Sequence, residues 1–292
     1  RRAIRSYMDN GYIPLEDMVE EAFHTNEQTS RTLEYAYDDY AVAQMAKALH
    51  DSCQDASLRQ KYLEDYNDLM RRSENWRNVI NPATGWADGR YENGKWENNE
   101  DLVHRKSYIT EGATCHYTWY VPQNVEGLFQ VINNSGQNVI TRLDRMFDEG
   151  LYWHGNEPCH QIAYLYNKAG APWKTQQRIH HILNTEYNDT PGGLSGNDDA
   201  GQMSAWYMFS AIGFYPVCPA TPYYYIGTPS FDKVTFNLEN GRMFEIVAEG
   251  VDDENFYIQQ VDLNGKSGYY LSHDDLLKGG KLSFRMGNSP KY

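Results

Sequence analysis

The sequence has little positive charge and no long hydrophobic run. Lys and Arg number 26 against 40 Asp and Glu, which gives a formal net charge of -14. Such an excess of acidic residues repels nucleic acid and anionic membrane surfaces, so we expect neither as a partner. No stretch approaches the roughly 18 consecutive apolar residues of a membrane-spanning helix. The chain begins at Arg1 without an initiator Met or a signal peptide, and we expect it to be part of a longer protein.

Several motifs of well-known chemistry are also missing. The four cysteines are widely spaced and form no CxxC pair, so the redox compartment and any pairing of Cys115 with Cys159 stay open. Neither the phosphate-binding pattern GxxxxGK[ST] nor the nucleophile elbow GxSxG occurs. Phosphoryl transfer and acyl transfer are therefore disfavoured as functions.

Aromatic residues, in contrast, are abundant at 14% of the chain, with 24 Tyr and 7 Trp. Many lie among Asn and Gly residues, as in the stretch from Trp86 to Trp96. Rings beside amides and carboxylates suit sugar binding, because the rings face C–H surfaces while the polar groups bond hydroxyls. Ordinary core packing explains any single ring equally well.

The pattern of residues divides the chain near residue 220. Before it, helical periodicity dominates: Pro14 suits a first helical position, and Ser30 suits the cap of a helix that runs to Leu49 with apolar residues near helical spacing. A second helix is expected at 57–80, with Leu58 among its inward-facing residues, and a long loop at 81–99. Further helices are expected at about 117–132, 138–147, 159–169, 172–187 and 201–212.

From residue 223 the segments become short and β-rich, and turn pairs such as Asn240-Gly241 separate them. Helices first and strands second predict an α+β protein with a helical domain at 1–220 and a β-rich domain at 221–292.

Three polar, glycine-bearing loops flank the predicted helices, at 110–117, 152–160 and 192–201. The third loop carries Asp198 and Asp199 just before a helix, where acidic residues also serve as caps. Two adjacent aspartates exceed what one cap requires, and neighbouring like charges raise one pKa, as a general base for water needs.

The first loop carries Glu111 ahead of an aromatic run. A carboxyl against aromatic walls loses solvent, which raises its pKa and keeps a proton for a leaving oxygen; a plain helix-start glutamate is the alternative. Two carboxylates on separate loops are what glycoside hydrolysis requires, one as acid and one as base.

The second loop supplies His154, Asn156, Glu157 and His160. Amide and carboxylate oxygens suit Ca²⁺, whereas two imidazoles suit zinc; no zinc motif such as HExxH is present. Oxygen ligation is favoured, although Asn156 and Glu157 could also cap the helix entered through Pro158.

At these loops the sequence resembles glycoside hydrolase family 92, the calcium-dependent exo-α-mannosidases. The matching motifs run in order along nearly the whole chain: Ser30 to Asp39 (SRTLEYAYDD), Glu111-Gly112, Tyr117 to Trp119, Val121-Pro122, His154 to Pro158 (HGNEP), Pro172 to Gln176 (PWKTQ), Gly196 to Asp199 (GNDD), Gly201 to Trp206 (GQMSAW) and Gly213 to Pro216 (GFYP).

The resemblance implies the C-terminal part of an (α/α)₆ toroid, followed by a β-sandwich-like domain, with an N-terminal β-sandwich outside this chain. It implies inverting hydrolysis of terminal α-mannosides of N-glycans or mannan, with Glu111 as general acid and Asp199 as general base. Asp198 is a neighbouring candidate. A periplasmic or secreted location follows from the resemblance as well.

The resemblance also implies that Asn156 and Glu157 engage Ca²⁺ and that His154, Trp153 and Asp39 line the mannose subsite. Members commonly show Glu-Gly-Asn and a Gln before the Tyr, where this chain has Ala113 and His116. Two alternatives stay open: a non-catalytic carbohydrate-binding protein of the same fold, and a zinc hydrolase using His154 and His160.

Overall fold

The computed structural model describes residues 3–18, 26–265 and 268–292. Backbone contacts divide the chain into two compact units, Arg1–Tyr152 and Trp153–Tyr292, and each is described by itself. This division differs from the domain boundary that we predicted near residue 220. That boundary marks the change from helices to strands along the sequence, and it stays a prediction. The described residues mix helices and sheets, as predicted, and form no closed β-barrel.

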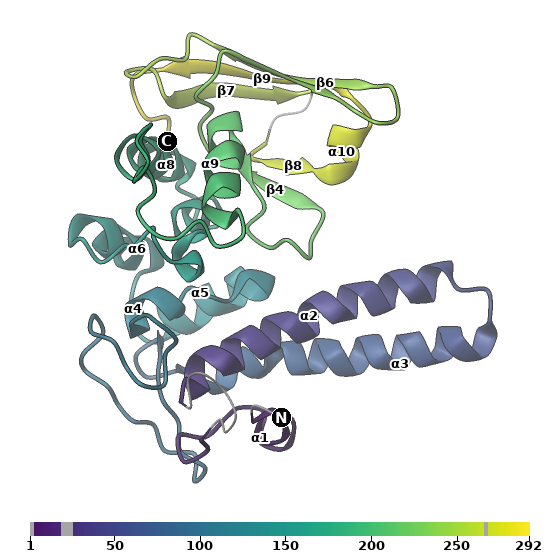
Figure 1. The fold of residues 1–292 in the computed structure, drawn as a ribbon, viewed down its shortest axis with the longest axis vertical. Helices are drawn as coiled ribbons and strands as arrows, with labels where there is room; N and C mark the ends of the chain where they lie inside the picture. Colours follow the sequence, from purple (N-terminus) through teal and green to yellow (C-terminus); the bar gives the residue numbers. More distant parts are fainter. Residues whose placement is uncertain (1–2, 19–25, 266–267) are drawn as a thin grey trace. The chain divides into compact units, whose positions relative to one another are not determined.

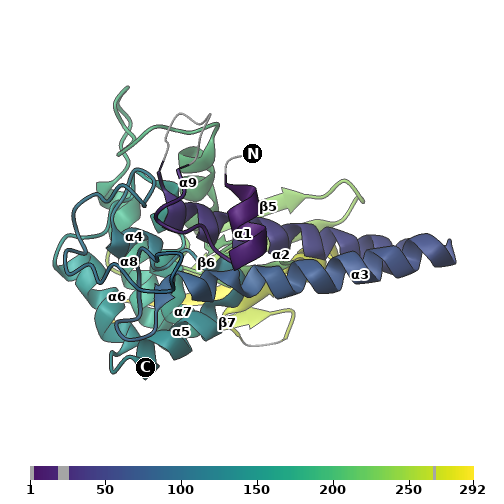
Figure 2. The same ribbon diagram turned by 90° about the horizontal axis from the view of Figure 1, so that it is seen from below.

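Two long antiparallel helices dominate the first unit. They are α2 (Gln28–Ser52) and α3 (Ala56–Arg72), which lie side by side in both ribbon views (Figures 1 and 2). Asp55 caps α3 by accepting hydrogen bonds from Ser57 N and Leu58 N at 2.9 Å. Their connected ends are open to solvent: Met45 is 66% and Leu58 46% exposed, so the inward facing that we predicted for Leu58 is wrong.

The start of α2 also differs from the prediction. Pro14 lies in a turn, closed by Asp17 N donating to Pro14 O at 3.0 Å, and not in a helix. Ser30 is not the cap, since α2 begins at Gln28 after Glu27, which has φ 77°. The Ser30 hydroxyl instead accepts a hydrogen bond from Thr110 N, in the loop that precedes Glu111. The short helix α1 (Ile4–Asn10) lies before this region.

The segment 81–99 is a loop, as predicted, with a small hairpin of β1 (Ile80–Asn81) and β2 (Trp86–Ala87) at its base. Arg142 on α6 (Val139–Asp148) donates to Gly85 O and Thr84 O at 2.7 and 2.8 Å, and its guanidinium lies 3.9 Å from the centre of the Trp86 ring. Trp86 is therefore packed by a cation and takes a structural role. The unit also holds α4 (Thr114–Tyr117) and α5 (Val125–Asn134).

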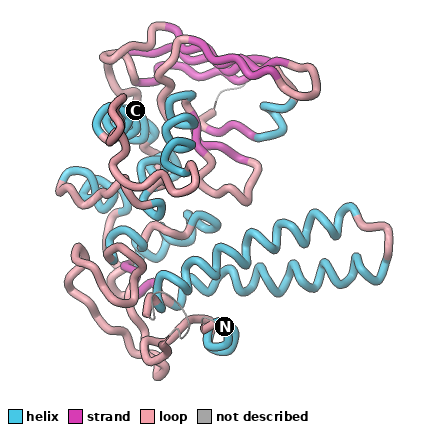
Figure 3. The backbone as a smooth tube through the Cα atoms, in the orientation of Figure 1, coloured by secondary structure: helices cyan, strands magenta, loops and turns pink. Residues whose placement is uncertain are grey.

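The second unit combines short helices with two sheets, as the secondary-structure colours show (Figure 3). Its helices are α7 (Leu165–Lys168), α8 (Pro172–Thr185), α9 (Gln202–Ile212) and α10 (His273–Leu277). One sheet has the order β3-β4-β8, from Phe214–Tyr215, Tyr223–Ile226 and Tyr270–Ser272. The other has the order β5-β6-β9-β7, from Lys233–Asn237, Met243–Glu249, Gly280–Gly287 and Tyr257–Leu263.

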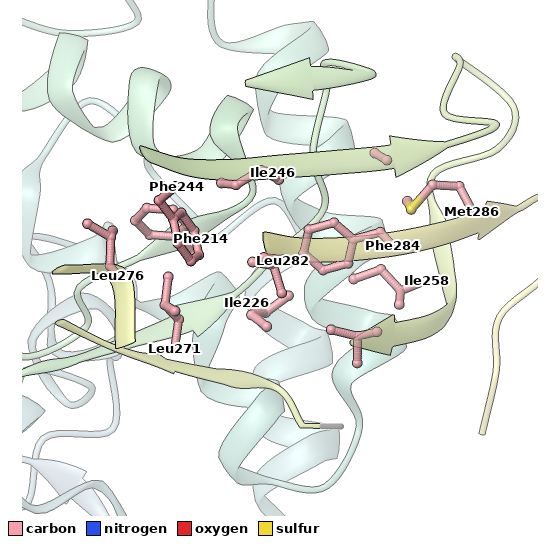
Figure 4. Close-up of a cluster of buried hydrophobic side chains, with 12 residues drawn as sticks. Phe214, Ile226, Phe244, Ile246, Ile258, Leu271, Leu276, Leu282, Phe284 and Met286 are labelled. Carbon is pink, nitrogen blue, oxygen red and sulfur yellow. The ribbon is translucent and has the colours of Figure 1, made fainter. Parts of the chain in front are cut away.

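The two sheets share one hydrophobic core (Figure 4). Phe214, Ile226 and Leu271 enter it from the first sheet, while strands β6 and β9 of the second contribute alternate residues such as Phe244 and Leu282, and β7 contributes residues on both sides of a register shift. The alternation follows from the two-residue period of a strand, which directs every second side chain to one face. The strands that we predicted in 223–286 are thus confirmed as a β-rich region.

Candidate active site

The loop that carries Glu111 begins the candidate site in the first unit. Glu111 has φ 46°, a left-handed conformation that few residues other than glycine adopt. Such backbone strain persists only where surrounding contacts hold it, and it concentrates at functional sites. The Glu111 carboxyl is exposed, so the burial that we expected for it is wrong in this chain.

Burial instead affects Glu34, on α2. Its carboxyl accepts a hydrogen bond from the Tyr117 hydroxyl at 3.5 Å. Loss of solvent, together with the negative charge of Asp38, raises the pKa of Glu34 to about 7, which the Tyr117 and Tyr120 hydroxyls partly oppose. We assigned no role to Glu34 from the sequence. The sequence contained one indication of such a role: Glu34 lies four residues after Ser30 and therefore on the same face of the helix.

Asp39, which we predicted to line the mannose subsite, points to a different role. Arg72 donates to both of its carboxylate oxygens, at 2.8 and 3.1 Å, and the Tyr7 hydroxyl donates to one of them at 2.8 Å. These bonds join α2 to α3 and α1. The geometry therefore gives Asp39 a structural role and offers no support for a sugar contact through its carboxylate.

The loop at 192–201 carries the two aspartates in the second unit. Asp199 has φ 46°, the same left-handed conformation as Glu111. Asp198 accepts hydrogen bonds from Ser204 N and Ser204 Oγ at 3.0 and 2.9 Å, and so caps the start of α9. The alternative of a helix cap therefore applies to Asp198, and Asp199 has a strained backbone; the assignment of the general base stays a prediction.

Two glycines bring this loop against the loop at 152–160. A Cβ atom added to Gly196 would lie 2.4 Å from Gly155 O and 2.7 Å from Gly155 Cα. A Cβ atom added to Gly155 would lie 2.6 Å from Ser195 O and 2.7 Å from Trp153 Nε1. The two backbones touch, so these two loops meet within this unit.

His154 and His160 lie beneath the two loops, each 1% exposed. His160 Nε2 donates to His154 O at 3.0 Å and His160 Nδ1 accepts from Gln202 Nε2 at 3.1 Å. Since Tyr187 donates its hydroxyl proton to Met203 O, His154 Nε2 donates to the Tyr187 oxygen at 2.6 Å. Burial lowers the pKa of His154 to about 3 and that of His160 to about 4, so both are neutral.

These bonds count against the zinc alternative, because both ring nitrogens of His160 already bond the protein. They also make His154 a support for the Asp199 loop, since Tyr187 and Met203 link it to the start of α9. Its contact with mannose stays a prediction. Trp153, in contrast, is 38% exposed, and its ring can receive a sugar face.

Asn156 and Glu157 remain the oxygen donors for a cation. Both are half-buried, and Asn156 has extended backbone at the start of a short 3-10 helix, Glu157–Cys159. An amide and a carboxylate fit a hard cation such as Ca²⁺. Among the described residues no group of three or more His, Cys, Asp or Glu side chains could hold a metal. A calcium shell here would therefore need backbone carbonyls, water or substrate hydroxyls as further donors.

Each unit of this mixed helical and sheet protein thus carries one of the predicted carboxylates on a strained loop, Glu111 in the first and Asp199 in the second. Comparison with protein families gives this arrangement its class. The model of the glycosyl hydrolase family 92 catalytic domain matches residues 1–288. The chain belongs to this family.

Solved structures agree with the assignment. A family GH92 α-mannosidase from Bacteroides thetaiotaomicron is 40% identical and superposes with a TM-score of 0.88, covering 100% of this chain and 38% of that one. Its complex with mannoimidazole superposes with a TM-score of 0.86. An inverting family GH92 mannosidase from the same bacterium is 33% identical, with a TM-score of 0.85, covering 99% of this chain and 40% of its own.

A curated relative from the fungus Arthroderma benhamiae is described as an uncharacterized secreted glycosidase. It is 28% identical over 316 residues, which cover 98% of this chain and 39% of the relative. The chain thus spans about two fifths of the length of these relatives. No helix among the described residues has the length and apolar character to cross a membrane.

Proposed function

We propose that the protein carrying this chain is an inverting exo-α-mannosidase that hydrolyses terminal α-mannosides with the help of Ca²⁺. The observation that carries the proposal is that two carboxylates, Glu111 and Asp199, lie on family-matched loops and share an unusual left-handed backbone at φ 46°. Inverting glycosidases need one carboxyl group on each side of the scissile bond. The inverting mannosidase among the structural neighbours supports this mechanism.

In this mechanism Glu111 donates its proton to the glycosidic oxygen as the bond from the anomeric carbon breaks. Asp199 accepts a proton from a water molecule, whose oxygen attacks the same carbon from the opposite face. The products are the free alcohol and mannose of inverted configuration.

Asn156 and Glu157 would hold the calcium ion, which supplies positive charge for two neighbouring sugar hydroxyls when bound. Trp153 stacks on the sugar, and His154 supports the loop of the general base from beneath. Asp198 serves as the cap of α9 and, as a neighbouring carboxylate, as the second candidate for the base. A mannose-containing oligosaccharide is the proposed partner.

We further propose that the helices within 1–220 belong to an (α/α)₆ toroid and that 221–292 forms a sandwich-like domain. The greater length of the relatives leaves room for the other toroid helices and an N-terminal β-sandwich. The secreted relative supports a secreted or periplasmic location.

The decisive experiment follows the anomer first released by the full-length protein, by NMR during turnover of an α-mannoside. Inversion predicts β-mannose, and release of the α-anomer would contradict it. In the same assay we expect a chelator to abolish hydrolysis and calcium to restore it. Full activity in excess chelator would remove the metal from the proposal. Binding of mannosides without turnover would favour the non-catalytic alternative.

A further inference from the structure

The loop ahead of Glu111 is anchored to the first turn of α2. Thr29 N and Ser30 N bond Tyr108 O at 3.1 and 3.3 Å, and Glu27 N bonds Ser107 O at 2.8 Å. The start of a helix has amide groups without partners inside the helix, and here the loop satisfies some of them. The position of this loop is therefore set by α2.

Ser30 extends this anchor to the residue directly before Glu111. Its hydroxyl oxygen accepts the Thr110 N–H at 2.9 Å and lies 2.8 Å from Thr110 Oγ1. The Ser30 hydroxyl donates its own proton to Glu27 O at 3.2 Å, so the Thr110 hydroxyl donates to Ser30. Ser30 is 0% exposed, and water cannot replace it in this role.

His116 holds the other side of the same turn. Its Nδ1 accepts the Ala113 N–H at 3.2 Å, and its Nε2 donates to Leu151 O at 2.9 Å. This pattern requires the neutral ring with the proton on Nε2. Burial lowers the pKa of His116, which favours that neutral form. The imidazole thus links the backbone of Ala113, two residues after Glu111, to the backbone of Leu151 near the end of the unit.

We propose that Ser30 and His116 are positioning residues that hold Glu111 in its left-handed turn so that its carboxyl meets the leaving oxygen. Glu111 lies between the two amides that they bond, those of Thr110 and Ala113. Both side chains act on backbone groups, and neither needs to touch the substrate. The inference rests on Glu111 being the general acid of the proposed function.

The test uses the dependence of the rate on the leaving group. A poor leaving group, such as the alcohol released from a mannobioside, needs a well-placed acid, whereas a dinitrophenolate departs without protonation. A misplaced Glu111 therefore slows the first substrate much more than the second. A loss of overall structure slows both alike.

Ser30→Ala should lower kcat for the mannobioside by about 10- to 100-fold and kcat for the dinitrophenyl mannoside by less than about 3-fold, with KM changed little. Thr32→Val is the matched control. Thr32 lies on the same turn of α2, is 0% exposed and accepts an N–H through its hydroxyl, but the donor is Ile13. This variant should keep the leaving-group ratio of the native protein.

His116→Leu should reproduce the effect of Ser30→Ala, and His116→Gln should restore the rate, since a Gln amide can accept from Ala113 N and donate to Leu151 O. If Ser30→Ala fails to fold, Thr110→Val tests the same contact. Equal losses on both substrates, equal losses in Ser30→Ala and Thr32→Val, or a His116→Gln as impaired as His116→Leu would each overturn the proposal.

Glu111→Gln separates this failure from that of the proposed function. If that variant keeps full activity on the mannobioside, Glu111 is not the acid and the proposed function fails. If it loses that activity while the Ser30 and His116 variants do not, only the positioning proposal fails.

Discussion

The loops of Glu111 and Asp199 have the same backbone angle but hold it by different means. Around Glu111, side chains from elsewhere in the fold bond the flanking amides, through Ser30 and His116. Around Asp199, the backbone itself packs against a second loop, with Gly196 against Gly155. A hydrogen-bonding side chain can be replaced by another of similar shape. A backbone contact without room for a Cβ atom admits only glycine, so we expect the two loops to tolerate substitution very differently.

The largest effect should come from the carboxylate of Asp199, the proposed base. Asp199→Asn should lower kcat about 10²- to 10⁴-fold for both leaving groups, because attack of water is then unassisted. Thermal unfolding should change little. Asp198→Asn is the matched variant: its amide oxygen still caps α9, and we expect a loss of less than about 10-fold. A reversed order of these two variants would make Asp198 the base.

The glycine contact gives the next effect. Gly196→Ala would place Cβ 2.4 Å from a backbone oxygen, and we expect a loss of about 1–3 kcal/mol in the free energy of unfolding, with lower affinity for calcium, as the loops move apart. Both can be measured by thermal unfolding with and without calcium.

Gly192→Ala, on the same loop, is the control, since no atom lies within 4 Å of its added Cβ. This variant should be as stable as the native protein. Equal stability of the two alanine variants would show that the backbone contact does not hold the Asp199 loop.

The smallest effect concerns Glu34, beside the Glu111 loop. Its pKa is about 7 in the folded protein against an ordinary 4.5, so between these values the folded state binds a proton that the unfolded chain releases. Stability from this group is full below pH 4.5 and is lost as pH rises to 7, by about 1–3 kcal/mol.

Glu34→Gln mimics the protonated acid and should remove this dependence. Urea unfolding of both proteins at pH 5 and pH 7.5 measures the difference. If the native protein and Glu34→Gln differ in unfolding free energy by the same amount at pH 5 and at pH 7.5, the pKa of Glu34 is not raised.

The comparison also shows which features the sequence could predict. Local patterns predicted α8, α9 and the strands, because periodicity and turn residues act over a few positions. They failed at Pro14 and Ser30, where partners distant in sequence decide the structure: Ser30 suits a cap by composition, but its hydroxyl bonds Thr110, 80 residues away. The sequence likewise could not show which of the adjacent residues Asp198 and Asp199 bonds Ser204; in the structure it is Asp198.

Burial was the hardest property to predict for the site. Aromatic neighbours in sequence suggested a desolvated Glu111, yet α2 brings Glu34 to Tyr117 and leaves Glu111 exposed. Asp39 belongs to a motif that matches the family, but its partner Arg72 lies on α3, outside that motif, so the motif alone could not predict their ion pair. The family motifs predicted which loops carry the candidate site, and the three-dimensional contacts determine the hydrogen bonds that each side chain in them makes.

Asp199, Ala200 and Gly201 form three consecutive left-handed residues before α9, at φ 46°, 58° and 97°. Only the last of these is the residue that such a conformation favours. A laboratory selection for heat resistance would therefore favour replacement of Ala200 with Gly. This change would raise the free energy of unfolding, since strain of this kind costs about 1–3 kcal/mol per residue. The same change would give the neighbouring Asp199, the proposed base, more conformational freedom, so greater heat resistance at this point would be accompanied by a lower catalytic rate.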